Sequence, residues 1–208
     1  LAHGAHLETS SSFDIDLIWK LYNNGKVDEK TIIINNGFKT EEYTWKISDL
    51  INKGFKNIIP VLDNKNEIFF YDQFVDADEF NVGIRVATEE EPNFEFYTSR
   101  LGIRNSEVLP FYRNVLSQNK RAKLKMLHFF VDTGIKDSIY YWGELKKGIA
   151  LYCELKKVCP TLTALNIGGG MPIPNTLGFE YDYQYMINEI VNLIKESCGE
   201  YGIEEPDI

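Results

Sequence analysis

Three consecutive glycines, Gly168–Gly170, end an apolar run in the segment LNIGGGMPIPN at residues 165–175. Glycine costs about 0.5–1 kcal/mol relative to alanine inside regular structure, so three together are unexpected in a strand that only has to pack. A glycine-rich strand exit lets backbone N–H groups face an anion without hindrance from Cβ atoms, and phosphate is the usual anion. The spacing is not GxGxxG, which disfavours a dinucleotide, and GxxxxGK[ST] is absent, which excludes a P-loop site. A phosphate site and a simple tight turn are the two interpretations of these glycines.

Side chains that could bind a ligand also lie near the exits of other predicted strands. Thr133 offers a hydroxyl that could share a phosphate with the glycines, and Arg85 offers a positive charge. Phe130 could cover a flat ring. Two of them have a plainer alternative, since Arg85 could pair with Asp63 or Glu67, and Phe130 could simply belong to the core.

A carboxylate and several histidines complete the candidate set. Glu8 comes at a strand exit, where a charge either has a purpose or is a solvated loop acid. His128 alternates with Phe130 along a predicted strand, so both could point inward, and a core histidine is the plainer interpretation. His3 and His6 show no metal-ligand spacing, so we expect no metal site.

The composition excludes several classes of function. The 208 residues are 44% hydrophobic and 25% charged, as in an ordinary globular protein, and the net charge of −9 argues against a nucleic-acid partner. No apolar run of about 18 residues exists, and the first ten residues lack the features of a signal peptide, so we expect neither membrane insertion nor export. The three cysteines, without CxxC spacing, favour reduced thiols in a cytoplasmic protein.

Strand-like and helix-like segments alternate along the chain in six β/α units. The predicted strands cover residues 5–9, 31–35, 56–62, 80–87, 123–131 and 162–167. The predicted helices cover residues 13–25, 41–54, 66–74, 106–119, 138–158 and 181–202. This alternation predicts an α/β fold with a parallel sheet and right-handed crossovers, in one domain.

A doubly wound sheet and an incomplete (β/α)₈ TIM barrel both accommodate six units. The chain opens almost directly on a strand and stops at IEEPDI, where a seventh strand should begin. A complete barrel needs about 250 residues, which two further units would supply. We therefore expect residues 1–208 to form the central part of a barrel, with one strand before it and at least one after it.

Several motifs together resemble a known family. LNIGGGMPI resembles the LDIGGG loop of fold type III pyridoxal-phosphate-dependent decarboxylases, which include ornithine, diaminopimelate and biosynthetic arginine decarboxylases and have an alanine-racemase-like barrel. HLETSSSFDI resembles LEAGSKAEL, NVGIRVAT with SRLGI resembles IGIRI with SKFGL, and LHFFVDTGI resembles LHFHIGSQI. IINNGFKTEEY is similar to ICNGYKDEEY of the arginine decarboxylases. The motifs follow the family's order along nearly the whole chain.

The resemblance implies a role for each candidate residue toward pyridoxal 5′-phosphate. Gly168, Gly169 and Gly170 would supply the phosphate loop, and Thr133 a hydroxyl to the phosphate. Arg85 would be the arginine beneath the cofactor ring. Glu8 would be the acid near the Schiff-base lysine.

Three positions depart from the family pattern. Phe130 replaces the histidine that stacks on the pyridine ring, and it can stack but cannot hydrogen-bond or carry charge. Asp132 would place a carboxylate beside the phosphate, and Asn166 replaces the aspartate of LDIGGG. These changes indicate a divergent branch of the family or a homologue that has lost activity.

By the same resemblance, the Schiff-base lysine is expected upstream of Leu1, so no catalytic residue is expected within this chain. The acid on the pyridine nitrogen is expected beyond Ile208, and the C-terminal β-domain is expected to lie outside this chain as well. Lys39 as an internal Schiff-base lysine is disfavoured, because its motif falls elsewhere in the family pattern. We therefore expect this segment alone to be inactive.

The resemblance implies that the intact parent decarboxylates a basic amino acid in the cytoplasm as a homodimer or higher homo-oligomer. L-arginine to agmatine, a step of polyamine biosynthesis, is favoured by the motif NNGFKTEEY. Diaminopimelate, ornithine and carboxynorspermidine are the alternative substrates. A non-catalytic regulatory homologue and an unrelated barrel isomerase acting on a sugar phosphate are the rival functions.

Overall fold

Parallel strands alternate with helices throughout the computed structural model, which describes residues 6–87, 101–131, 138–172 and 180–208. The strands are β1 (Leu7–Thr9), β2 (Ile33–Asn35), β3 (Ile58–Leu62), β4 (Phe80–Ala87), β5 (Ile103–Arg104), β6 (Ala122–Phe129) and β7 (Ala164–Asn166). The helices are α1 (Ser12–Asn23), α2 (Glu41–Asn52), α3 (Glu67–Phe74), α4 (Asn105–Asn114), the 3₁₀ helix η2 (Leu116–Gln118), α5 (Ser138–Val158) and α6 (Tyr183–Tyr201). Every predicted strand and helix is present, and the structure adds β5 and η2.

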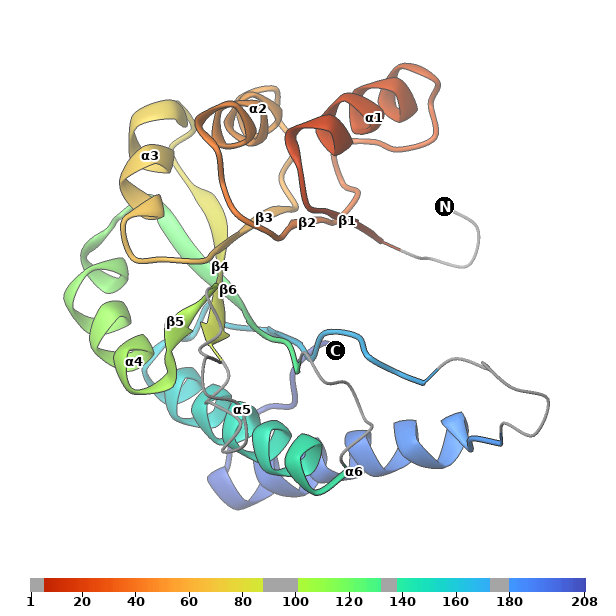
Figure 1. Cartoon of the computed structure of the whole chain (residues 1–208). Coiled ribbons are helices and arrows are strands. Elements are labelled where there is room, and N and C mark those ends of the chain that lie inside the picture. Colours follow the sequence, from red (N-terminus) through yellow and green to blue (C-terminus); the bar gives the residue numbers. More distant parts are fainter. Residues whose placement is uncertain (1–5, 88–100, 132–137, 173–179) are drawn as a thin grey trace, which may run out of the picture.

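The strands form one curled parallel sheet in the order β1-β2-β3-β4-β6-β7, with β5 paired to the end of β4. Figure 1 shows the helices in an arc around the outside of the curl, with the concave side open between β1 and β7. This is the predicted incomplete (β/α)₈ barrel rather than a doubly wound sheet, because helices cover only the outer side. At the end of the chain, Asp207 makes a parallel bridge to Ala164, as the predicted strand start at IEEPDI requires.

Strand side chains alternate between two apolar layers. The outer layer packs against the helices and contains Ile33, Ile58 and Ile84, which are at most 1% exposed. The inner layer is smaller and joins Ile59, Val61 and Met126 inside the curl. The sheet buries one face against the helices and the other inside the curl, so the strands are apolar along most of their length.

Helix α2 shows how local sequence positions the strand exits. Its N-cap, Thr40, accepts a hydrogen bond from the backbone N–H of Tyr43, and two glutamates follow in the first turn, where the helix dipole favours them. Tyr43, buried on the inner face of α2, extends its hydroxyl to within 2.7 Å of the Thr9 hydroxyl on β1. The Asn35 amide of β2 donates to the same Thr9 oxygen at 2.7 Å. These bonds fix the exits of β1 and β2 relative to α2.

Helix α5 packs closely on β6 through a glycine. A Cβ atom at Gly148 would lie 2.8 Å from the ring of Phe129, which is closer than packed side chains approach. Gly143, one and a half turns earlier in the same helix, is exposed, and a Cβ atom there would meet nothing within 4 Å. The cysteines Cys153, Cys159 and Cys198 are buried free thiols, as predicted.

We predict that Gly148→Ala destabilises the fold by about 1–2 kcal/mol, because overpacking against Phe129 outweighs the better helix propensity of alanine. Gly143→Ala is the matched control in the same helix and should stabilise the fold by about 0.5–1 kcal/mol through propensity alone. Urea denaturation of both variants checks the pair. Equal effects of the two substitutions would contradict the close packing of α5 on β6.

Candidate functional site

The strand register brings four polar side chains into one row at the carboxyl ends of the strands. Arg85 of β4 pairs laterally with His128 of β6, which pairs with Asn166 of β7. Asp63 follows the last paired residue of β3 and lies beside Arg85, with 3.9 Å between the carboxylate and the guanidinium. Side chains in register on neighbouring strands share a face, so the row lies inside the curl, above the apolar inner layer. The sequence placed these residues near strand exits but did not show that they form a row.

Phe130 and Gly168 lie one pleat above this row, two residues beyond His128 and Asn166. The Arg85 guanidinium lies 6.0 Å from the centroid of the Phe130 ring. A Cβ atom at Gly168 would lie 2.9 Å from the edge of the same ring. The glycine turn, Arg85 and the Phe130 ring therefore form one contiguous surface, as expected for residues at the exits of parallel strands.

Each of the three positions is occupied by glycine for a different structural reason. Gly168 has a φ of +72°, its N–H donates to the Asn166 side-chain oxygen at 2.9 Å, and its close contact with β6 excludes a side chain. Gly170 has a φ of +96°. Gly169 has neither feature, because its φ is not positive and a Cβ atom there would meet nothing within 4 Å. The turn alone explains Gly168 and Gly170, whereas at Gly169 the absence of a side chain leaves open space for a ligand.

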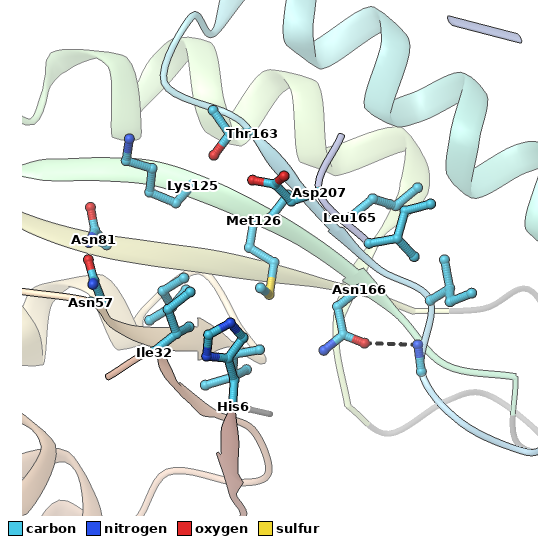
Figure 2. A pocket seen from close by; sticks show the side chains of 16 residues that line it. His6, Ile32, Asn57, Asn81, Lys125, Met126, Thr163, Leu165, Asn166 and Asp207 are labelled. Atoms are coloured by element: carbon cyan, nitrogen blue, oxygen red, sulfur yellow. Dashed lines mark hydrogen bonds between the residues drawn. The ribbon is translucent and has the colours of Figure 1, made fainter. Parts of the chain in front are cut away.

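A hollow of about 790 Å³ lies on the concave side of the sheet. Figure 2 shows it extending from Lys125 and Thr163 to Asn166, whose side chain bonds to the turn at Gly168. At the carboxyl ends of the strands, the hollow is therefore bounded by the glycine turn.

Buried charges surround the exits of β2 and β3. Lys39 is 8% exposed, and its ammonium donates to the carbonyl oxygens of Gly37 and Val61, both at 2.7 Å. Burial lowers the pKa of Lys39, and the charges of Glu67 and Asp63 oppose this. The two carbonyl acceptors and the two acidic neighbours offset part of the cost of burying this ammonium.

The two acids near Lys39 respond differently to burial. Burial raises the pKa of Glu67 to about 7, although Lys39 and the Asp63 backbone N–H, which donates to Glu67 at 3.0 Å, act to lower it. Burial also raises the pKa of Asp63, and the charges of Lys39 and then Arg85 lower it. The sequence offered Asp63 and Glu67 as alternative partners of Arg85, but it did not show that Lys39 lies with them.

His128 is neutral inside the row. Burial lowers its pKa to about 4, the charge of Arg85 acts in the same direction, and contact with Asn166 and the charge of Glu8 oppose them. Its Nδ1 atom has no hydrogen-bond partner in the ranges that the structure describes. From sequence, the plainer interpretation of His128 is a core histidine. His128 is indeed buried, but it lies within the polar row rather than in the apolar layer.

The structure corrects the position of Glu8. The sequence placed it at a strand exit, but the strand continues through Thr9, which pairs with Asn35, so Glu8 lies within β1. Its carboxylate is exposed and accepts a hydrogen bond of 2.7 Å from the Asn36 amide. Thr133 and Asp132 lie outside the described residues.

The decisive comparison concerns the family to which these motifs belong. The sequence profile of the family described as "Pyridoxal-dependent decarboxylase, pyridoxal binding domain" matches residues 1–208, the whole chain. The chain belongs to this family. The relationship predicted from LNIGGG and its companion motifs is thereby confirmed, and pyridoxal phosphate is the cofactor of the family.

Individual pyridoxal-dependent decarboxylases resemble the chain over most of its length. A biosynthetic arginine decarboxylase of Prochlorococcus marinus strain MIT 9215 is 24% identical over 198 residues, covering 87% of this chain and 30% of that protein. The structure of the biosynthetic arginine decarboxylase of Campylobacter jejuni covers 99% of this chain and 34% of its own, with a TM-score of 0.76 and 22% identity. The diaminopimelate decarboxylase structure from M. jannaschi covers 98% of this chain and 47% of its own, with a TM-score of 0.72 and 19% identity. The chain spans about a third of the length of the arginine decarboxylases that it matches.

Two further observations concern membrane spans and metal sites in the described part of the chain. None of its helices is long and apolar enough to cross a membrane. Within the described ranges, no group of three or more His, Cys, Asp and Glu side chains is arranged to hold a metal ion.

The pKa values of His128 and Glu67 predict opposite dependences of stability on pH. His128 binds its proton more weakly when folded, so its contribution is complete above pH 6.5 and lost as the pH falls toward 4. Relative to His128→Gln, the native chain should lose about 3 kcal/mol of unfolding free energy over this range. Urea denaturation between pH 4 and 7 measures the difference, and parallel curves would contradict a neutral buried histidine.

Glu67 has the reverse sign, because its pKa is higher in the folded chain. Its contribution is complete below pH 4.5 and lost as the pH rises through about 7. Relative to Glu67→Gln, the native chain should therefore lose stability, by about 3 kcal/mol or less, as the pH rises from 4.5 to 7. The same denaturation series checks it, and a difference that grows in favour of the native chain would contradict the raised pKa.

Proposed function

We propose that residues 1–208 form the central part of a pyridoxal-phosphate barrel domain in a decarboxylase of basic amino acids. The observation that carries this proposal is the open, exposed Gly169 in a turn packed against the surface formed by Phe130 and Arg85. A site for a phosphorylated aromatic ring needs an unobstructed backbone for the phosphate, a flat apolar face and a nearby charge, and these residues supply all three.

Each described residue of the proposed site has a distinct task toward the cofactor. The turn at Gly168–Gly170 would hold the phosphate, and Phe130 would cover the ring. Arg85 would contribute positive charge at the ring, and Glu8 would be the acid near the lysine that holds the cofactor. Thr133, outside the described residues, would add a hydroxyl to the phosphate.

Pyridoxal phosphate, when bound, supplies an electron sink for the electron pair released as CO₂ leaves an amino acid. The residues of this chain bind and orient the cofactor, and they control charge around it. His128 stays neutral beside Arg85, so the Arg85 guanidinium, which faces Asp63, is the one positive charge of the row. The lysine that holds the cofactor is proposed to lie outside residues 1–208. Lys39 is unsuited to that task, because two backbone carbonyls already bind its ammonium.

We propose L-arginine as the substrate, with agmatine as the product, in a cytoplasmic homo-oligomer serving polyamine biosynthesis. The resemblance of NNGFKTEEY to arginine decarboxylases and the similarity to proteins named biosynthetic arginine decarboxylase support this choice. Diaminopimelate is the second candidate, supported by the fold similarity to a diaminopimelate decarboxylase.

Binding of pyridoxamine 5′-phosphate tests the cofactor site on this chain, because this analogue needs no lysine to hold it. We predict that Gly169→Ala weakens its binding about tenfold, about 1.4 kcal/mol, and leaves stability unchanged, because the added methyl group meets only open space. Gly199→Ala is the matched control, since Gly199 also has open space around its Cβ position and lies in α6. Calorimetric titration and thermal unfolding measure both properties. Equal affinities for the native chain and Gly169→Ala would contradict the phosphate assignment.

Borohydride reduction of a longer polypeptide that contains this chain tests the remaining assignment. We predict that the pyridoxyl label falls on a lysine outside residues 1–208, as peptide mass mapping would show. A label on Lys39 would contradict the assignment of the site. Absence of any label would favour a non-catalytic homologue, for which Phe130 is the specific motivation.

A further inference from the structure

The Asp63 carboxylate is buried yet has very few partners. Asp63 is 4% exposed, and neither of its carboxylate oxygens accepts a hydrogen bond from any residue that the structure describes. Burying an ionised carboxylate is costly unless a cation compensates it. The side chain therefore requires a cation, and the described cation within 4 Å is Arg85, at 3.9 Å.

The backbone of Asp63 is held firmly at the same time. Its N–H donates to the Glu67 carboxylate at 3.0 Å, and its carbonyl oxygen accepts from the N–H of Gly102 at 3.0 Å. Glu67 is itself bound by the Asn64 amide at 2.9 Å. The carboxylate is thus presented from a fixed backbone, with its oxygens left for a cation.

Lys39 supports this arrangement without competing for the carboxylate. Its ammonium is already bound to the carbonyls of Gly37 and Val61, and no ion pair within 4 Å links it to Asp63. Its charge nevertheless favours the ionised form of Asp63 across the buried region. Lys39 stabilises the anion at a distance, and Arg85 remains the partner in contact.

Among the residues that the structure describes, few others restrain Arg85. On its other side lie His128, which is neutral, and the face of the Phe130 ring at 6.0 Å. Its side chain is 16% exposed, so a route toward solvent exists on the concave side. A cation–π contact at this distance is weak and does not by itself fix a guanidinium.

We propose that Asp63 is a positioning residue for Arg85, holding the guanidinium against the Phe130 ring. Glu67 fixes the backbone of Asp63 for this task. The inference rests on the proposed function in one respect, because Arg85 is taken to face the cofactor ring. Asp63 acts through Arg85 and is not assigned any contact with cofactor or substrate.

The first test follows Arg85 itself and needs no cofactor. In the native chain labelled with ¹³C and ¹⁵N, the Arg85 Nε signal should shift with the same pH midpoint as the Asp63 carboxyl carbon. In Asp63→Asn the Arg85 side chain should become more mobile, with a sharper, averaged Nε signal. An Arg85 signal that ignores the Asp63 titration in the native chain overturns the proposal, even if the variant fails to fold.

The second test measures binding of pyridoxamine 5′-phosphate. Asp63→Asn should weaken binding about tenfold, equivalent to about 1.4 kcal/mol. The matched control is Glu107→Gln, which removes a carboxylate from an exposed ion pair of 2.8 Å with Lys65 and should leave binding unchanged. If the native chain binds the analogue and Asp63→Asn binds equally well, the positioning role is wrong while the cofactor site stands. If the native chain does not bind it, the cofactor assignment fails, and the arginine signals still decide whether Asp63 positions Arg85.

Discussion

One register shift between β4 and β6 determines which side chains reach the inside of the curl. Val82 pairs with Leu124, but the next residue, Gly83, pairs with Met126, so β6 carries one extra residue at this point. Leu124 packs in the outer layer and Met126 in the inner layer, although strict alternation would put both on the same face. A bulge of this kind re-aims every residue that follows it. Without this bulge, the His128 side chain would point toward the helices instead of into the curl.

The consequence extends across the sheet. Because the bulge puts His128 beside Arg85, the pairing of β6 with β7 continues the row to Asn166. Asn166 in turn binds the first N–H of the glycine turn. A backbone irregularity near the middle of one strand is therefore connected to the glycine turn at the end of another. The charges along this row are balanced because its histidine is neutral and its asparagine carries no charge.

Much of the fold could be predicted from sequence because its signals are local. Apolar periodicity gave each helix and strand, and the alternation of the two gave the parallel sheet and the incomplete barrel. β5 could not be predicted, since two residues carry no periodicity. The strand around Glu8 was predicted to end at residue 9, as it does, so Glu8 belongs inside that strand and not after it. The glycine turn and Arg85 were found because glycine runs and isolated charges are visible in the sequence.

The rest of the candidate site depends on non-local contacts. Nothing in the sequence around Lys39 shows that its ammonium meets the carbonyl of Val61, 22 residues away. The pairing of Asp63 with Arg85 was one alternative among several, and the spacing could not decide it. The β6 bulge could not be predicted from sequence either, since a bulge is defined by the pairing of its strand with a neighbouring strand.

Phe129 is pressed between two glycines that belong to different parts of the molecule. Its ring leaves no room for a side chain at Gly148 of α5, and its carbonyl oxygen lies 2.9 Å from the Cβ position of Gly168. Positions 129 and 148 therefore behave as a single volume shared by two residues. In a library of variants, a larger residue at 148 would survive chiefly in combination with a smaller one at 129. Exchange at this pair is an epistatic route by which helix α5 and strand β6 would have to evolve together.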